Sequence, residues 1–350
     1  MWPPGPRGQP RRVAPTIMND TLLTVENLKT YFFTERGVFK SVDDVSFTVP
    51  RGKTVGIVGE SGSGKSVTAL SILRLVSAPG KIVGGRVMVS CRGVLQYAPT
   101  GTVDLLTLEE SEMRRFRGGK IAMIFQEPMT SLNPVFTIGD QIEEAVALHQ
   151  KELNEAQRWE QVLEVLRLVR IPDPERAARS YPHELSGGMR QRAMIAIALG
   201  CRPEILIADE PTTALDVTVQ AQVLELLREL RERLGMSLIL ITHDLGVVAE
   251  QADEVIVMYA GKIVEQGTVR QIFSHPRHPY TRALLEALPT FHTTGRLRTI
   301  PGSVPSLAAL PRGCSFQERC DRVQQRCREE DPELMVMGEG QVARCFFPEL

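Results

Sequence analysis

The chain has 350 residues, 43% of them hydrophobic, and a formal net charge of −1. Since domains average about 150 residues, this length suits one large α/β domain with an appendage, and the apolar fraction is ample for a packed core. A charge so near zero argues against nucleic acid or an anionic membrane surface as the main partner.

The first 20 residues are rich in proline, glycine and arginine and lack the apolar segment of a secretory signal. We predict a disordered tail there. No apolar run reaches the roughly 18 residues that a membrane-spanning helix needs. The chain holds six cysteines. Without a secretory signal, these are expected to be reduced thiols or metal ligands rather than disulfides, which points to the cytoplasm.

The next part of the chain alternates between apolar and polar residues in short runs. This alternation predicts strands at residues 22–25, 42–49 and 54–58. After Ser66 the period becomes helical, and one face carries Ala69, Leu70, Leu73 and Val76. Residues 79–120 predict further strands and loops, ending in a buried strand at 121–125.

The second half of the chain predicts alternating helices and strands. Helices are expected at residues 139–168, 189–199 and 217–234, and apolar strands of the buried parallel type at 205–208 and 238–242. Beyond residue 265 prolines break the chain, and four of the six cysteines follow residue 313. We therefore expect a main domain over residues 21–265 and an extension over 266–350.

Residues 59–66 read Gly-Glu-Ser-Gly-Ser-Gly-Lys-Ser and lie between a predicted strand and a predicted helix. Glycines let successive backbone N–H groups point at phosphate oxygens, and the helix adds its positive N-terminal end. The lysine can reach the β- and γ-phosphates, and the last serine can bind Mg²⁺. Such a pattern also arises by chance in Gly/Ser-rich loops, but the flanking elements favour a nucleotide site. Its expected contacts are Gly59, Ser61, Gly62, Ser63, Gly64, Lys65 and Ser66.

Two acidic residues, Asp209 and Glu210, end another apolar strand. Asp209 is placed to hold Mg²⁺, and Glu210 could accept a proton from attacking water. Acidic residues at strand ends also cap helices. The phosphate loop upstream favours the catalytic interpretation.

Residues 185–192 read Leu-Ser-Gly-Gly-Met-Arg-Gln-Arg and open a predicted helix. Ser186 is a candidate N-cap, while Gly187 and Gly188 leave the helix end open to an anion. An ordinary capped helix explains the serine. It does not explain a second phosphate-binding end in one chain.

In this order the motifs resemble those of the ATP-binding subunits of ABC transporters, from about Leu22 to Ala287. The resemblance implies a P-loop NTPase (RecA-like) α/β core with an antiparallel β subdomain and a helical subdomain at about 127–185. It makes Glu210 the catalytic glutamate and His243 the switch histidine. Gln126 would sense or bind Mg²⁺ after its strand.

The resemblance also implies a composite site. Two subunits stack head to tail, so Ser186 and Gly188 would contact the γ-phosphate of ATP held by the partner's loop. Asp216 would lie in the loop between the two subunits. Phe32 is expected against adenine, although the neighbouring Tyr31, on the opposite strand face, is an alternative.

Coupling to transport follows from the same resemblance. ATP with Mg²⁺ would draw two ATPase subunits together, and the second is expected to be a related subunit rather than a copy. Two transmembrane permease subunits would dock near Gln126 and residues 127–184, at the cytoplasmic face of the membrane. An extracytoplasmic binding protein would act indirectly.

The end of the chain narrows the resemblance. Residues 278–285 (His-Pro-Tyr-Thr-Arg-Ala-Leu-Leu) and 300–305 (Ile-Pro-Gly-Ser-Val-Pro) are similar to dipeptide, oligopeptide and nickel importer ATPases. Peptides are the expected substrate, with nickel as an alternative. A soluble ATPase of repair or translation is disfavoured, because the chain has no long coiled-coil insertion and only one phosphate loop.

The small Cys-rich extension carries a last expectation. In that family a four-cysteine tail can hold a [4Fe–4S] cluster, and four thiolates suit Fe–S or zinc. The Cys-x2-Cys knuckles of zinc ribbons are absent here, and free or disulfide-linked thiols stay open. The expected ligands are Cys314, Cys320, Cys327 and Cys345.

Overall fold

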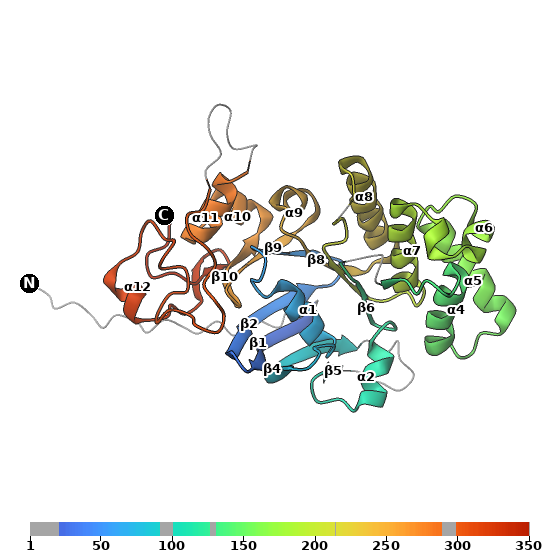
Figure 1. Ribbon diagram of the computed structural model, residues 1–350, viewed down its shortest axis with the longest axis horizontal. Helices are drawn as coiled ribbons and strands as arrows, with labels where there is room; N and C mark the ends of the chain where they lie inside the picture. The colour runs from blue at the N-terminus through green and yellow to red at the C-terminus, as the bar shows by residue number, and fades with distance from the viewer. Residues whose placement is uncertain (1–20, 92–100, 127–130, 214, 289–298, 350) are drawn as a thin grey trace, which may run out of the picture.

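The computed structural model describes residues 21–91, 101–126, 131–213, 215–288 and 299–349. The disordered tail predicted for residues 1–20 lies outside these described residues. Figure 1 shows a central sheet with a helical lobe at one end, the C-terminal segments at the other and a separate sheet below. Three buried apolar clusters correspond to these parts.

The central sheet has its strands in the order β11-β12-β10-β9-β3-β8-β7-β6. Its parallel part contains β3, β8, β7, β6 and β9. Their bounds are Thr54–Val58, Ser237–Ile241, Ile205–Asp209, Ile121–Ile124 and Glu254–Tyr259. Every residue of β3, β7 and β8 is buried, because helices cover both faces. The apolar strands expected from the sequence are thus confirmed.

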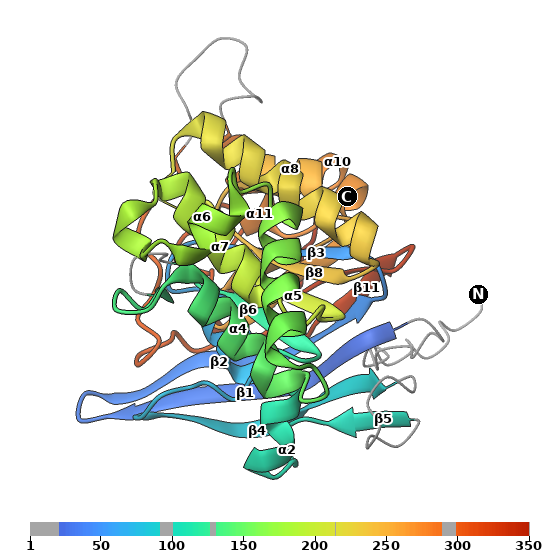
Figure 2. The same ribbon diagram turned by 90° about the vertical axis from the view of Figure 1, so that its right-hand side faces the viewer.

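A second, antiparallel sheet orders its strands β2-β1-β4-β5 (Figure 2). These strands span Gly37–Pro50, Thr21–Thr34, Gly80–Cys91 and Gly101–Asp104. Helix α1, Lys65–Ile72, packs between the two sheets through Ala69 and Ile72. The prediction that this helix reaches Val76 is wrong, since the backbone turns to a positive φ of 54° at Arg74.

The opposite face of the central sheet carries α7, α8 and α9 (Gly187–Leu199, Val217–Leu234 and Leu245–Gln251). Helix α8 has the bounds expected from the sequence, with its buried stripe at Val223, Leu227 and Leu230. A helix missed by the sequence analysis, α2, spans Glu110–Phe116, where strands and loops were expected. Its start is stabilised by a reciprocal cap between Glu109 and Glu112.

The helical lobe contains α4, α5, α6 and the short 3₁₀ helix η1 (Ile138–His149, Glu155–Leu168, Pro174–Arg179 and Pro182–Glu184). The helical character predicted for residues 139–168 is confirmed, but it is divided between two helices, α4 and α5. The chain leaves the helix after His149, and Asn154 caps a new one by accepting the N–H of Gln157 at 3.0 Å.

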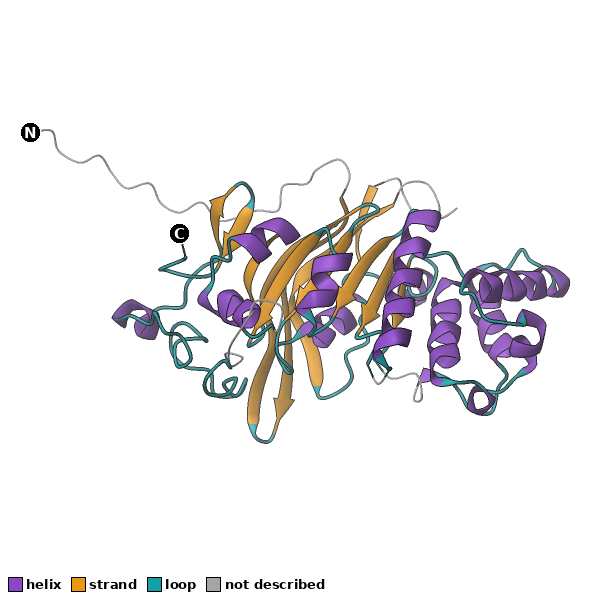
Figure 3. Cartoon of the chain, turned by 90° about the horizontal axis from the view of Figure 1, so that it is seen from above, coloured by secondary structure: helices purple, strands orange, loops and turns teal. Residues whose placement is uncertain are grey.

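The C-terminal segment contains β10, α10, α11 and α12 (Lys262–Thr268, Val269–Ser274, Pro279–Glu286 and Gln325–Glu329). Two late strands, β11 (Met335–Gly338) and β12 (Gln341–Ala343), return to the central sheet, where β12 pairs with β10. Figure 3 shows this segment at the end of the sheet remote from the helical lobe. In the described part of the chain, no helix combines the length and apolarity that crossing a bilayer requires.

Candidate active site

The phosphate loop connects β3 to α1, at the carboxyl end of the parallel strands. Gly59, Gly62 and Gly64 have φ values of 151°, 76° and 102°, which side-chain-bearing residues rarely adopt. At two of them there is also no room for a side chain. A Cβ would lie 2.2 Å from the carbonyl oxygen of Met258 at Gly59, and 2.2 Å from that of Ser41 at Gly64. The loop shape thus depends on glycine.

Lys65 lies inside this loop. Its Nζ donates to the carbonyl oxygens of Gly59 at 2.7 Å and Glu60 at 3.0 Å. Burial lowers the pKa of Lys65, and the carboxylates of Glu210, Asp209 and Glu60 oppose that shift. The loop therefore presents a buried cation next to backbone N–H groups, a combination that suits a polyphosphate.

Ser66 and Asp209 meet at the base of the loop, where the serine hydroxyl donates to the carboxylate at 3.0 Å. Burial raises the pKa of Asp209, the Ser66 hydrogen bond lowers it, and the Glu210 charge raises it further. A buried carboxylate beside a hydroxyl fits the oxygen ligands that Mg²⁺ prefers. When bound, Mg²⁺ would neutralise charge on the phosphates at this point.

Three sequence-predicted residues converge at the ends of β6, β7 and β8. Glu210 accepts from the Gln126 side-chain amide at 3.2 Å, and its other oxygen lies 3.3 Å from His243 Nδ1. Thr213 donates its hydroxyl to Glu210 at 2.9 Å. These strands are parallel neighbours, so their carboxyl ends lie at one edge of the sheet, beside the phosphate loop.

Glu210 has two properties suited to chemistry. Its backbone adopts a positive φ of 46°, a conformation that costs energy for a non-glycine residue and occurs often at functional sites. Its side chain is 16% exposed, whereas that of His243 is 67% exposed. A sheltered carboxylate next to an exposed imidazole can polarise a water molecule at the edge of the site.

The second motif forms the start of α7, with Ser186 as the residue that caps it. Ser186 caps the helix by accepting the Met189 N–H at 3.4 Å. Ser186 and Gly187 are exposed and Gly188 is half-buried. A Cβ at Gly187 would meet no atom within 4 Å, so this helix end is open.

Asp216 is exposed and caps α8 through the Val219 N–H at 2.9 Å. The adjacent Val217 is 85% exposed, a large apolar surface for one side chain. On β1, the Phe32 ring packs against Gly80, so closely that a Cβ added to Gly80 would lie 2.7 Å from the ring. Tyr31 points elsewhere and donates its hydroxyl to Asp43 at 2.6 Å.

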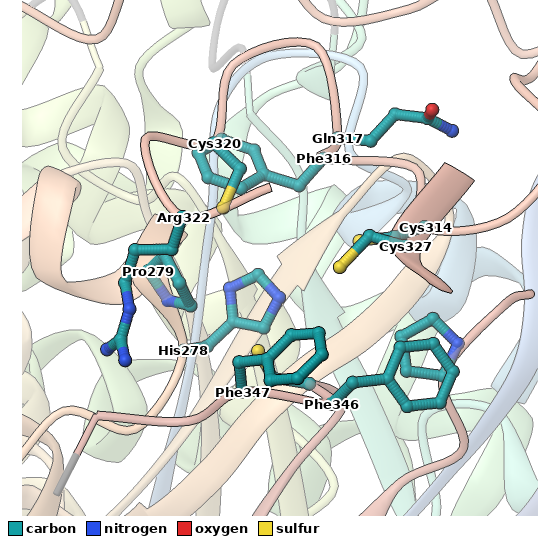
Figure 4. Close-up of a pocket in the computed structure, with 12 residues that line it drawn as sticks. His278, Pro279, Cys314, Phe316, Gln317, Cys320, Arg322, Cys327, Phe346 and Phe347 are labelled. Atoms are coloured by element: carbon teal, nitrogen blue, oxygen red, sulfur yellow. The ribbon is translucent and has the colours of Figure 1, made fainter. Parts of the chain in front are cut away.

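The four C-terminal cysteines line one pocket with His278 and Phe316 (Figure 4). In Figure 4 the sulfurs of Cys314, Cys320 and Cys327 point toward a common space. The structure thus brings together residues spread over a long, proline-broken segment. All four are free thiols.

Backbone N–H groups stabilise the sulfurs of this pocket. Those of Phe316, Arg322 and Phe347 each bond to the cysteine two positions earlier, at 314, 320 and 345. Burial nevertheless raises the pKa of Cys314 to about 12 and that of Cys345 to about 11. Burial thus favours the neutral thiol at Cys314, Cys320 and Cys345, and a bound metal would have to displace these protons.

Among the described residues, no three His, Cys, Asp or Glu side chains form a group that could hold one metal ion. This argues against a single zinc ion on the cysteines. The same finding leaves the expected [4Fe–4S] cluster on these four cysteines unsupported.

Sequence analysis missed two residues that contact the phosphate loop. The Glu60 N–H donates to the Tyr280 hydroxyl at 3.0 Å, and Arg319 forms two bonds to the Glu60 carboxylate. Tyr280 and Arg319 lie 220 and 259 residues after Glu60 in the sequence. No local signal could have paired them.

Comparison with known proteins gives two matching families. Residues 42–213 match the ABC transporter family, and residues 264–327 match the family described as oligopeptide/dipeptide transporter, C-terminal region. The chain is 54% identical over 330 residues to a probable peptide ABC transporter ATP-binding protein, y4tR of Sinorhizobium fredii, covering 93% of this chain and 95% of that protein. It is 48% identical over 328 residues to the dipeptide transport ATP-binding protein DppD of Escherichia coli, covering 93% and 97%.

Solved structures agree with these matches. The dimeric structure of MJ0796, a bacterial ABC transporter cassette, is 27% identical with a TM-score of 0.61, covering 71% of this chain and 99% of that one. A dimeric post-hydrolysis state of the same cassette, bound to ADP and Pi, has a TM-score of 0.60 at 27% identity, covering 71% and 99%. The expected α/β cassette with an antiparallel β subdomain is thereby confirmed.

Proposed function

This chain belongs to the ABC transporter ATP-binding proteins, and we propose that it hydrolyses ATP to drive the uptake of peptides across a membrane. The observation that carries the proposal is the convergence of Gln126, Glu210 and His243 beside a glycine-dependent phosphate loop. The match of residues 264–327 to the oligopeptide/dipeptide C-terminal region supports the peptide class.

The proposed reaction transfers the γ-phosphoryl group of ATP to water. Lys65 and the loop N–H groups stabilise the phosphate charge. Ser66 and Asp209 would hold Mg²⁺, which would supply further positive charge when bound. Glu210 accepts the proton of the attacking water as the new P–O bond forms and the bond to ADP breaks. Gln126 and His243 orient this carboxylate and the water from its two sides.

The site of one chain is proposed to be incomplete. The open helix end is exposed at Ser186 and Gly187 and half-buried at Gly188. The apolar Val217 next to Asp216 is also exposed. An exposed helix N-terminus can bind an anion supplied by a partner. We infer that these residues cover the γ-phosphate held by a second ATPase subunit, and the proposed partner is a related subunit.

The proposed docking site for the permease is an apolar groove between the central sheet and the helical lobe. Its exposed residues include Leu75 and Phe125, 37% and 41% exposed. Val135 and Phe136, which begin the lobe, are 71% and 52% exposed. Phe125, which lines the groove, directly precedes Gln126 in the sequence. This supports coupling between a cytoplasmic permease segment and the hydrolytic site. The chain would then act at the cytoplasmic face of the membrane, with a substrate-binding protein outside it.

We further propose that Cys314, Cys320, Cys327 and Cys345 bind a [4Fe–4S] cluster. Their shared pocket and the N–H donors to three of the sulfurs support thiolate ligands. A cluster would stabilise the fold of the tail. Anaerobic purification is expected to give a brown protein with about four irons per chain. A colourless, iron-free protein would contradict the cluster. Cys201→Ser is the matched control and should keep the iron content of wild type, because Cys201 lies outside the pocket.

The test of the proposed activity compares wild type with Glu210→Gln in the complex with its permease and partner subunits. We expect ATP to remain bound while hydrolysis and peptide uptake fall by about 100-fold or more. Glu229→Gln is the control, because Glu229 makes an exposed ion pair with Arg170. Unchanged hydrolysis in Glu210→Gln would mean that the partner's site performs the reaction.

A further inference from the structure

A direct connection joins the cysteine-bearing tail to the phosphate loop. Arg319, which precedes Cys320, donates two hydrogen bonds to the Glu60 carboxylate, from Nη1 to Oε2 at 2.6 Å and from Nη2 to Oε1 at 2.9 Å. The arginine side chain is 4% exposed and the glutamate side chain 30% exposed. A bidentate ion pair of this kind, or fork, fixes the orientation of the carboxylate and also neutralises its charge.

Arg319 is itself held firmly in place. Its Nε donates to the carbonyl oxygen of Pro301 at 2.9 Å. The guanidinium lies 5.7 Å from the ring centre of Tyr259 and 6.0 Å from that of Phe316. Hydrogen bonding to Glu60 raises the pKa of Arg319 above its ordinary value. The tail thus presents a fixed, permanent cation to the phosphate loop.

Glu60 is the second residue of that loop, where a negative charge opposes nucleotide binding. Its carbonyl oxygen accepts from Lys65 Nζ at 3.0 Å, and its charge acts on Lys65. An unpaired carboxylate here would repel the phosphates and compete with them for the lysine. The ion pair with Arg319 removes that repulsion and turns the carboxylate toward the tail.

We propose that Arg319 is a positioning residue for the ATP phosphates, acting by neutralising and orienting Glu60, and that it makes nucleotide affinity depend on the cysteine pocket. The dependence follows from the chain itself, because Arg319 is bonded directly to Cys320 and stacks near Phe316, and both Cys320 and Phe316 line the pocket. A displaced Cys320 displaces the guanidinium. This inference rests on the proposed ATPase function.

The test measures binding of Mg²⁺-ATP to the full-length chain and the kinetic constants of hydrolysis in the complex with its permease and partner subunits. Arg319→Ala is expected to raise the Kd and KM for ATP about tenfold, with a smaller change in kcat. Arg319→Lys keeps the charge but loses the fork, so an intermediate Kd is expected. Adding Glu60→Gln to Arg319→Ala should restore the Kd to within about twofold of Glu60→Gln alone, because the repelling charge is gone.

The matched control is Arg270→Ala, which removes the same charge from the C-terminal extension. Arg270 is exposed on α10 and does not line the cysteine pocket, so the Kd of this variant should stay at the wild-type value. The inference is overturned if Arg319→Ala binds ATP normally, or if Glu60→Gln does not rescue it. If Arg319→Ala does not fold, the comparison of Arg319→Lys with and without Glu60→Gln decides in the same way. Failure of the ATPase proposal is distinct, since wild type itself would then not bind ATP.

A second arm tests the dependence on the pocket. Cys320→Ser should raise the Kd for ATP several-fold in the wild-type background. It should leave the Kd unchanged in the Glu60→Gln background, where no carboxylate needs neutralising. An equal loss in both backgrounds, or none in either, would show that the cysteine pocket does not act through Arg319 and Glu60. Iron content measured on the same samples reports separately on the cluster.

Discussion

The nucleotide edge and the cysteine tail are assembled in different ways. At the nucleotide edge, Gln126, Asp209, Glu210 and His243 lie at the ends of parallel strands or within two residues of them. Neighbouring strands bring these short motifs together. In the tail, residues from α11, from loops and from β12 meet through contacts that span long stretches of sequence. The first arrangement derives its precision from the sheet. The second depends on a few buried polar contacts and on the proposed cluster.

This difference predicts that the nucleotide edge is rigid but needs a second subunit to complete its site. The tail needs no second subunit but depends on single residues. Damage at the edge should abolish turnover without unfolding. Damage in the tail should reduce stability and reach the ATP site only through Glu60, which the Tyr280 hydroxyl and Arg319 both contact.

The largest effect is expected from Gly187→Asp. A carboxylate at the first turn of α7 favours the helix electrostatically, and there is room for it, since nothing lies within 4 Å of the Cβ position. It would repel a γ-phosphate held by the partner. We expect hydrolysis by the dimer to fall about 100-fold or more, with the melting temperature unchanged.

The uncharged Gly187→Asn is the matched control, because it has the same shape and is expected to retain much more activity. ATP binding by the separate chain should be normal in both variants. Equal loss of activity in the two variants would mean that bulk, and not charge, disturbs the site.

Glu265→Ala tests the dependence of the tail on single residues. The Glu265 side chain is fully buried and accepts the N–H groups of Arg277 at 2.7 Å and His278 at 2.8 Å, and the Gln341 amide at 2.8 Å. Removing it leaves these donors unsatisfied, at about 1–3 kcal/mol each. We expect a loss of about 3 kcal/mol or more in the free energy of unfolding, measured by denaturant titration. The exposed Glu250→Ala on α9 should change it little.

Tyr280→Phe should have an intermediate effect, because it removes one contact between the two regions. The Tyr280 side chain is fully buried and its hydroxyl accepts the Glu60 N–H. Phenylalanine keeps the ring packing but leaves the Glu60 N–H without an acceptor, which lowers the free energy of unfolding by about 1–2 kcal/mol. A lower melting temperature that ATP partly restores is the expected result, since bound phosphate orders the loop. Restoration no larger than in wild type would argue against a loop effect.

These predictions also show why sequence analysis succeeded in one region and failed in the other. The phosphate loop, Asp209 and Glu210 are short motifs beside apolar strands, so local chemistry was enough to find them. Gln126 and His243 have no such local signature and were predicted only through the resemblance to a family. The break between α4 and α5 was missed because residues 139–168 keep a helical character while Asn154 starts a second helix. The contact of Arg319 with Glu60 has no local signature at all, because folding alone brings a tail arginine to the loop.

The smallest effect separates a local role of Asp216 from a role between subunits. Its carboxylate caps α8 through the Val219 N–H, so Asp216→Ala should cost about 1 kcal/mol of stability. Asparagine caps as well as aspartate, so Asp216→Asn should leave the unfolding free energy unchanged. If hydrolysis by the dimer still falls in Asp216→Asn, the negative charge acts across the subunit boundary. If the free energy of unfolding falls equally in both variants, capping by the side-chain oxygen does not stabilise α8. Even this short-range contact at the nucleotide edge would then depend on the residues that surround Asp216.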